Sequence, residues 1–228
     1  MKFWSSVPDV ALSAYTIIPY VKKDAATDEE SKTYNEFVYA LKDGRKIRFA
    51  SGDQDAAAAF AGGVEPPIHP WFQNAVLLPL PGSDPSGVDR SAEKTVRFAN
   101  ALAARFPECK VSCALVRTTA VPKSHRVPSD QRAKVEDHAR SMKLSERLPS
   151  HSQVILVDDV LTRGATAIGA ERVLRAAGVT SPVRLIAGAH TRFAEESPEG
   201  DVEWQVEWRF GASFPTKRKV KSHAPPRE

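Results

Sequence analysis

Residues 154–166 read VILVDDVLTRGAT, and this stretch decides the fold. Four apolar residues at 154–157 form a short run typical of a buried strand. Two carboxylates follow at once, then a short segment around Gly164, and then a helix-forming run from Ala167. A strand that leads through a glycine loop into a helix predicts an α/β unit with an anion-binding turn between its two elements.

The loop holds the groups that a sugar phosphate needs. Its backbone N–H groups, with the start of a helix behind them, form a cradle for an anion. Gly164 permits close approach and positive φ, and the hydroxyls of Thr162 and Thr166 add donors. Asp158 and Asp159 suit sugar hydroxyls, which donate hydrogen bonds. The segment therefore predicts a site for a phosphate with hydroxyls beside it, and the alternative is an acidic strand end that only caps a helix.

The surrounding chain predicts a parallel α/β sheet. Apolar runs indicate strands at 75–80, 111–116, 154–157 and 183–187, and helical spacing indicates helices at 91–106 and 167–177. Strands that alternate with helices predict right-handed crossovers and a mostly parallel central sheet flanked by helices. The carboxyl ends of such strands share one rim, where ligands bind. The loop after residue 80 and the polar, basic stretch 117–148, which we expect to end as helix, also reach this rim.

The two ends of the chain are expected to form a hood over this core. Residues 35–50 alternate around a central Asp-Gly pair, which predicts a hairpin, and 53–61 predict a short helix. Prolines then mark a boundary near residue 70. Residues 202–210, with Trp204 and Trp208 on one face, predict a strand with one buried side. We divide the chain into an N-terminal extension 1–70, a core 71–213 and a basic tail 214–228, expected to be disordered.

Segment 154–166 resembles the phosphoribosyl pyrophosphate (PRPP) motif of type I phosphoribosyltransferases, in which an apolar strand leads to two acids, two variable residues and Thr-x-Gly-x-Thr. In 6-oxopurine enzymes the position of Thr162 is an aspartate. Orotate and ComF-like enzymes have a threonine there, as this chain does. Residues 117–167 look most like ComF-like proteins, although this chain lacks their N-terminal cysteine-rich zinc element. The resemblance covers residues 75–190 and implies the type I phosphoribosyltransferase fold.

The resemblance also implies roles for individual residues. The expected PRPP-binding residues are Asp158, Asp159, Leu161, Thr162, Arg163, Gly164, Ala165 and Thr166. Gly82, Ser83 and Asp84 are expected to form the pyrophosphate loop. A flexible loop that closes over the ligand is expected to contribute Arg117, Lys123, Ser124 and Arg132. The expected catalytic residues are Asp158, Asp159, Arg117 and Lys123.

A metal ion is expected only together with the ligand, as Mg²⁺ bound with PRPP. The spacing of Cys109 and Cys113 fits neither a zinc knuckle nor a redox pair. Three of the six histidines, His125, His138 and His151, show no spacing that converges on a metal, and we expect them at the surface. The sequence therefore predicts no metal site made by the protein alone.

The implied function is a PRPP-dependent transfer of 5-phosphoribosyl to a nitrogenous base with release of pyrophosphate. The acceptor is not readable from the sequence. The alternative is a PRPP-binding regulatory or nucleic-acid-associated protein, such as a DNA-uptake or defence-type effector, that performs no turnover. A third possibility is an interaction protein with a vestigial site.

The net charge of +4 comes from one short run. Lys217, Arg218, Lys219 and Lys221 carry four positive charges, and 4 − 4 leaves zero for the rest of the chain. Such a run can contact nucleic acid weakly, although it is more often a solvated terminus. No apolar stretch is long enough to span a bilayer, and Pro8 and Asp9 interrupt any signal peptide. We expect a cytoplasmic protein, and the fold often forms homodimers.

Overall fold

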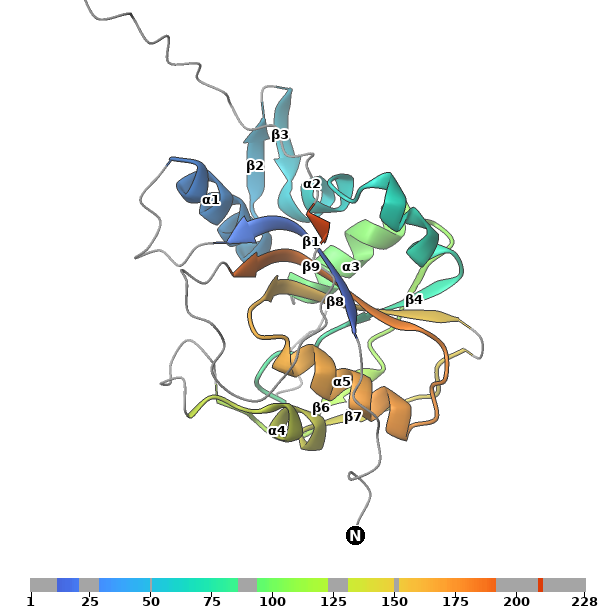
Figure 1. Cartoon of the computed structure of the whole chain (residues 1–228). Coiled ribbons are helices and arrows are strands. Elements are labelled where there is room, and N and C mark those ends of the chain that lie inside the picture. The colour runs from blue at the N-terminus through green and yellow to red at the C-terminus, as the bar shows by residue number, and fades with distance from the viewer. Residues whose placement is uncertain are drawn as a thin grey trace, which may run out of the picture.

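The computed structural model describes residues 12–20, 29–49, 51–85, 94–122, 131–149, 152–191 and 209–210. A parallel sheet with strand order β10-β1-β9-β8-β4-β5 runs through the centre of these residues (Figure 1). Its strands are β1 (Ser13–Tyr20), β4 (Ala75–Pro79), β5 (Lys110–Val111), β8 (Gln153–Leu161), β9 (Val183–Thr191) and β10 (Arg209–Phe210). The predicted α/β class and the parallel central sheet are confirmed.

Helices cover both faces of this sheet. They are α1 (Glu29–Asp43), α2 (Ala56–Gly62), α3 (Lys94–Arg105), α4 (Val135–Arg140) and α5 (Ala165–Ala176). Ile155 and Val157 pack into the core under α1, α2 and α3, whereas Val154 and Leu156 pack into the core under α4 and α5. Successive strand residues point to opposite faces, so a strand covered on both sides is apolar throughout. Figure 1 shows the two groups of helices on opposite sides of the sheet.

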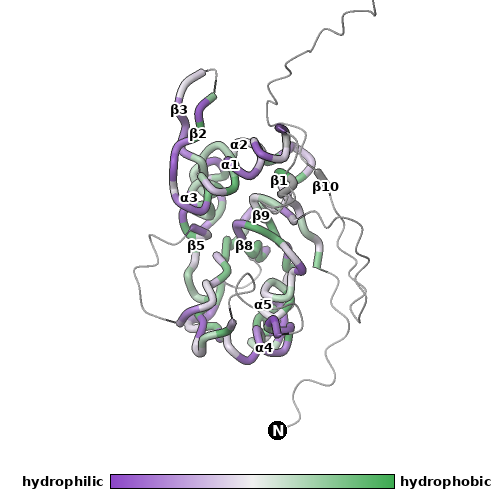
Figure 2. The backbone as a smooth tube through the Cα atoms, turned by 90° about the vertical axis from the view of Figure 1, so that its left-hand side faces the viewer, coloured by the Kyte–Doolittle hydropathy of each residue, from purple (hydrophilic) through white to green (hydrophobic). Residues whose placement is uncertain are grey.

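Two small antiparallel sheets flank the body. One is the hairpin of β2 (Lys46–Phe49) and β3 (Gly52–Asp55), which projects from the body and is mostly hydrophilic in Figure 2. The other pairs β6 (Leu115–Arg117) with β7 (Met142–Leu144). The second sheet closes the core under α4 and α5, because Leu115 and Met142 are buried there.

The hairpin predicted over residues 35–50 is wrong in its first half. Residues 35–43 belong to helix α1, and the hairpin lies further on, at 46–55. Asn35, Val38 and Leu41 are buried at helical spacing along α1. The alternation of apolar residues over a few positions also fits one face of a helix, and burial against the sheet selects the helix. The short helix predicted at 53–61 is α2, which begins three residues later than predicted, at Ala56.

The strand predicted at 111–116 is two strands in different sheets. Strand β5 pairs with β4 and ends at Val111, and the chain then turns to form β6 beside β7. The N–H of Ser112 donates to the carbonyl of Leu77 at 3.0 Å, which is the last backbone link to β4 before this turn. Neither β7 nor β1 was predicted. The helix predicted at 167–177 is confirmed as α5, and that predicted at 91–106 is confirmed as α3 from Lys94 on, with residues 91–93 outside the described residues.

The proline-rich segment is a 3-10 helix, η2 (Pro66–Phe72), whose Ile68 and Phe72 are buried in the same core as α3. The domain boundaries stay a prediction. Residues 202–208, with both tryptophans, and the basic tail lie outside the described residues, so the hood also stays a prediction. Within the described ranges, no helix combines the length and apolar character needed to cross a bilayer.

Candidate functional site

The two predicted acids lie on strand β8, which continues past them to Leu161. Asp158 is aligned with Ala187 of the neighbouring strand β9. Asp159 lies on the face covered by α1 and α3, where Lys94 pairs with it, and the side chain of Asp158 interacts with that of Asp159, so the two carboxyl groups lie close together. Asp159 is buried, Asp158 is half-buried, and the N–H of Asp159 donates to Asp158 Oδ1 at 2.9 Å.

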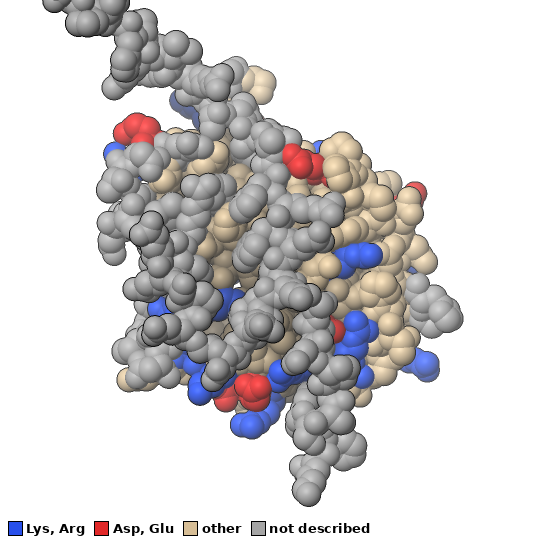
Figure 3. All heavy atoms as spheres, in the orientation of Figure 1, with Lys and Arg blue, Asp and Glu red and all other residues tan. Residues whose placement is uncertain are grey.

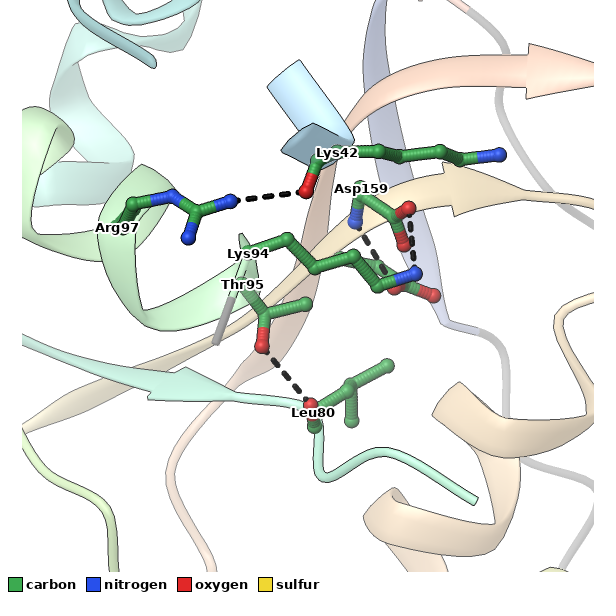
Figure 4. Close-up of polar contacts among 7 residues, drawn as sticks. Lys42, Leu80, Lys94, Thr95, Arg97 and Asp159 are labelled. Atoms are coloured by element: carbon green, nitrogen blue, oxygen red, sulfur yellow. Dashed lines mark hydrogen bonds and ion pairs between the residues drawn. The ribbon is translucent and has the colours of Figure 1, made fainter. Parts of the chain in front are cut away.

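Lys94, the first residue of α3, forms an ion pair with Asp159. Its Nζ lies 2.7 Å from Asp159 Oδ2, and 43% of the lysine side chain is exposed against 5% of the aspartate (Figure 4). Burial raises the pKa of Asp159, but the charge and hydrogen bond of Lys94 outweigh it and the pKa ends below its usual value, with Lys42 of α1 adding to the effect. The pKa of Asp158 is raised well above its usual value by burial and by the adjacent Asp159 charge.

Side-chain to backbone hydrogen bonds fix the start of α3 at this rim. Thr95 Oγ1 donates to the carbonyl of Leu80 at 3.1 Å, and Arg97 Nη2 donates to the carbonyl of Lys42 at 2.8 Å (Figure 4). The helix is thus tied both to the end of β4 and to the end of α1. Lys42 and Lys94 were not predicted as site residues. The rule that loops after parallel strands share a rim could have pointed to Lys94, which follows the loop after β4.

The predicted phosphate loop joins β8 to α5. Gly164 is the N-cap of α5 with φ 69° in the left-handed region, which explains why glycine stands there. Thr162 and Arg163 are exposed, and Thr166 is half-buried in the first turn of the helix. Gly164 has no side chain to cap the helix, so the first backbone N–H groups of α5 are available to an anion.

The predicted pyrophosphate loop follows β4, the neighbour of β8 in the sheet. Leu80, which leads from β4 into this loop, donates its N–H to the carbonyl of Val157 at 2.9 Å, so the loop leaves the sheet beside the acid pair. Gly82 and Asp84 are exposed and Ser83 is half-buried. The carbonyl of Ser83 accepts from the N–H of Val121 at 2.9 Å. The structure therefore brings both predicted anion loops to one rim.

Arg117 lies in β6 and is buried, rather than starting a flexible loop. Its guanidinium donates to the carbonyl of Gly82, to Ser141 Oγ and to the carbonyl of Pro81. Burial lowers the pKa of Arg117 to about 10. In this arrangement the side chain holds the loop after β4 from inside. Of the other residues predicted for the flexible loop, Arg132 is half-buried, and Lys123 and Ser124 lie outside the described residues.

His138 is buried in α4, so the expectation of a surface position is wrong for this residue. Its Nε2 lies 3.5 Å from Thr166 Oγ1 in the phosphate loop. The expectation failed because α4 packs tightly on α5, a contact between segments that sequence spacing does not show. His125 and His151 lie outside the described residues.

Metal ligands do not cluster in the part of the chain that the structure describes: no three His, Cys, Asp or Glu side chains come together there in a way that could hold an ion. Cys109 and Cys113 form no disulfide with another described residue. A hollow of about 360 Å³, lined by residues of η2 such as His69 and by residues around the end of α3 such as Phe106, which follows it, lies near the start of β4. It lies near the amino end of β4, whereas the acid pair lies toward the carboxyl end of β8.

Basic side chains gather on one part of the surface. On the face seen in Figure 3, Lys and Arg side chains concentrate in the lower half, over the region where Figure 1 shows α4 and α5. This is the side of the sheet from which the predicted phosphate loop and α5 arise, so the described residues there favour an anionic ligand.

Comparison with known proteins gives a partial match. No protein-family model matches the chain. An orotate phosphoribosyltransferase from Levilactobacillus brevis is 30% identical over 74 residues, which are 32% of this chain and 33% of that protein. The match thus spans about a third of the relative's length. The crystal structure of TT1426 from Thermus thermophilus aligns over 59% of this chain and 82% of that chain, with 14% identity and a TM-score of 0.28, too low to support a fold assignment.

Proposed function

We propose that the chain is a phosphoribosyltransferase, which binds PRPP at the rim formed by β8, β4 and α5 and transfers its 5-phosphoribosyl group to a nitrogenous base. The observation that carries the proposal is the order of groups along 158–166: two acids at the end of a central strand, then a left-handed Gly164 that opens an uncapped helix. The partial match to an orotate phosphoribosyltransferase supports the same class of reaction.

The loop 162–166 is suited to the 5-phosphate. The N–H groups at the start of α5 point at an anion placed there, and the helix dipole favours its charge. The hydroxyls of Thr162 and Thr166 supply further donors, and Arg163 and the backbone of Leu161 and Ala165 complete the cradle in this proposal. The phosphate end of the ligand is thereby fixed relative to β8.

The acid pair is suited to the ribose. Asp158, half-buried at the rim, can accept hydrogen bonds from the ribose hydroxyls. The carboxylate of Asp159 forms an ion pair with Lys94. The lysine side chain is partly exposed, and its ammonium group has three hydrogen-bond donors. Lys94 can therefore keep its ion pair with Asp159 and contact an anionic oxygen of the ligand at the same time. We assign it to the pyrophosphate side of the site, together with Gly82, Ser83 and Asp84.

Mg²⁺ fits the site only as a partner of the ligand. The ion takes six oxygens and gives up its water reluctantly, whereas the rim offers two carboxylates, one of them already paired with Lys94. Asp158 and Asp159 are the residues that would hold the ion, which when bound would neutralise charge on the pyrophosphate. Oxygens of PRPP and water would supply the other ligands.

In the proposed reaction the bond between C1 and the pyrophosphate oxygen breaks, and its electron pair leaves on that oxygen. The ring gains positive charge, which the negative charge of the acid pair, carried by Asp159 before the ligand binds, stabilises. A nitrogen lone pair of the acceptor then forms the bond to C1, and the acceptor loses a proton. Lys123 and Arg132 stay predicted contacts to pyrophosphate.

The test is pyrophosphate release with PRPP and a panel of acceptors that includes orotate, uracil and the purine bases. We expect release with at least one acceptor and a fall of about 100-fold or more in the double variant Asp158→Asn/Asp159→Asn, because hydrogen bonds to charged groups contribute about 1.5–3 kcal/mol each. Asp53→Asn is the matched control, since Asp53 is an exposed acid in the β2–β3 hairpin.

Calorimetry with PRPP separates the remaining outcomes. Tight binding without release for any acceptor would contradict transfer and favour a PRPP-binding regulatory protein. No binding of PRPP would contradict the proposed site itself.

A further inference from the structure

A buried polar chain connects the two anion loops on the α5 side of the sheet. It starts at Arg117, which donates to the carbonyl of Gly82 and to Ser141 Oγ. Ser141 Oγ in turn donates to the carbonyl of His138 at 2.9 Å. The imidazole of His138 then reaches Thr166 Oγ1 at 3.5 Å. The chain thus runs from the loop after β4 to the first turn of α5.

The members of this chain are fixed by burial. Arg117, Ser141 and His138 are 5%, 2% and 6% exposed. Thr118 reinforces the turn, because its N–H and its Oγ1 both donate to the carbonyl of Ser141, at 2.7 and 3.1 Å. Side chains held in this way have few alternative rotamers, so the imidazole has a defined direction toward Thr166.

A glycine on α5 permits this approach. A Cβ placed on Gly169 would lie 2.7 Å from His138 Cβ and 2.9 Å from the N of Ala139, distances that real side chains do not tolerate. Helix α4 therefore lies against the backbone of α5. This close contact brings the imidazole of His138 to Thr166, which lies about one helical turn before Gly169 in α5.

The surroundings of His138 select a neutral imidazole. Burial and the positive charge of Arg117 lower the pKa of His138 to about 4, against a smaller opposing effect of Asp137 on α4. Its Nδ1 is buried and has no hydrogen-bond partner among the described residues. A neutral imidazole carries one proton, and Thr166 is its polar neighbour on the Nε2 side.

We propose that His138 is a positioning residue for the phosphate cradle: its Nε2–H donates to Thr166 Oγ1 and leaves the Thr166 hydroxyl proton for a phosphate oxygen. This rests on the proposed function, because it assigns a phosphate to the loop 162–166. A free Thr166 hydroxyl rotates among several directions, whereas one that accepts from His138 is aimed at the ligand. The distance of 3.5 Å shortens when a phosphate draws the hydroxyl, as such contacts tighten in ligand complexes.

The test measures the dissociation constant of ribose 5-phosphate by calorimetry at pH 7.5. We expect His138→Leu to weaken binding about 10-fold, the effect of one hydrogen bond. His138→Gln, whose amide N–H can reach the same place, is expected to stay within about threefold of wild type. In a double-mutant cycle, His138→Leu is expected to have no effect once Thr166→Val is present, because the two residues act through one contact.

Glu136→Gln is the matched control for the α4–α5 contact. It removes an exposed ion pair between these helices, Glu136 with Arg172 at 2.7 Å, and leaves His138 in place. We expect it to leave the affinity for ribose 5-phosphate unchanged. A loss equal to that of His138→Leu would show that the position of α4 alone matters, and would overturn the proposal.

The other outcomes separate this inference from the proposed function. Absence of ribose 5-phosphate and PRPP binding in the wild type overturns both. Wild-type binding with equal affinity for His138→Leu, or an equal loss for His138→Leu and His138→Gln, overturns the role of His138 alone. If His138→Leu does not fold, His138→Asn replaces it, because the shorter amide fails to reach Thr166. Equal affinities for the Asn and Gln variants then overturn the proposal.

Discussion

Lys94 Nζ and Asp159 Oδ2 lie 2.7 Å apart, although 65 residues separate them in the chain. The aspartate is buried and the lysine is partly exposed, so the pair joins an interior anion to a cation that still meets solvent. Asp159 also feels the positive charge of Lys42 at the end of α1. Lysines of two helices, Lys94 of α3 and Lys42 of α1, therefore balance the negative charge of Asp159 before any ligand binds.

Lys94→Met is expected to lower the free energy of unfolding at pH 7 by about 1–3 kcal/mol. Breaking a fully buried pair costs about 3–5 kcal/mol, and exposed pairs contribute below about 1 kcal/mol. This pair lies between these limits, because only Asp159 is buried. Urea unfolding measures the change. Lys143→Met, at an exposed position of β7, is the control and is expected to change stability by less than about 0.5 kcal/mol.

The same variant has a defined pH dependence. The pKa of Asp159 is lowered in the folded protein, so its contribution to stability is present above the unfolded pKa and is lost as pH falls through the folded pKa. Without Lys94, burial raises the pKa of Asp159 above its ordinary value, so the difference between wild type and Lys94→Met is expected to be large at pH 7 and to shrink steadily as the pH falls through the acid range toward 3. A difference that stays constant down to pH 3 would contradict the assignment of the pair.

The β8–α5 unit could be predicted from the sequence because everything that forms it is local. The apolar run 154–157, Gly164 and the helical run that follows lie within about two dozen residues, and each favours the same structure. The same holds for Gly178, which ends α5 with φ 84°. Locality also explains why the acids and the phosphate loop were predicted together.

Contacts between distant segments could not be predicted in this way. Lys94 and His138 join the site through helix packing. The place of Lys94 after the β4 loop indicates the rim, but nothing in the sequence indicates its pairing with Asp159 or the contact of His138 with Thr166. Helix α1 was missed because a short alternating run fits a strand as well as one face of a helix. Strand β1 was missed because nothing in the sequence shows that Ser13–Tyr20 pairs with β9, whose residues come about 170 positions later.

Gly164→Ala is expected to weaken ribose 5-phosphate binding by tenfold or more and to lower stability by about 1–2 kcal/mol. The left-handed conformation costs an L-residue about that much, and relief of the strain moves the N–H groups that face the ligand. Gly178→Ala is the matched control, because Gly178 also has positive φ, at the other end of the same helix, and open space around it. The control is expected to share the stability loss and to keep the affinity, and equal affinity losses would contradict the cradle.

Gly169→Ala is expected to lower the free energy of unfolding by about 2 kcal/mol, because an added methyl group in a tight contact forces backbone shifts. The nearest atoms, at 2.7 Å and 2.9 Å, belong to His138 Cβ and to the backbone of Ala139, so they cannot turn away. Gly62→Ala is the control: its Cβ would lie 3.9 Å from the nearest atom, the end of the flexible Arg105 side chain. This control is expected to be neutral or slightly stabilising, and a neutral result at Gly169 would show that α4 is less tightly packed than described.

His138 is expected to make the protein less stable as the pH falls from 6.5 to 4. Its pKa is about 4 in the folded state, below the ordinary 6.5, because burial and Arg117 disfavour the charged form. Between these values the unfolded chain binds a proton that the folded chain does not, so stability rises with pH across this window and the effect is complete below pH 4. The shift corresponds to about 3 kcal/mol. His138→Gln removes this proton uptake, and urea unfolding at pH 7.5, 6 and 5 is expected to show a shallower pH dependence than wild type. Parallel curves for the two proteins would mean that the pKa of His138 in the folded state is close to the ordinary 6.5, and would contradict its burial beside Arg117 as a neutral imidazole.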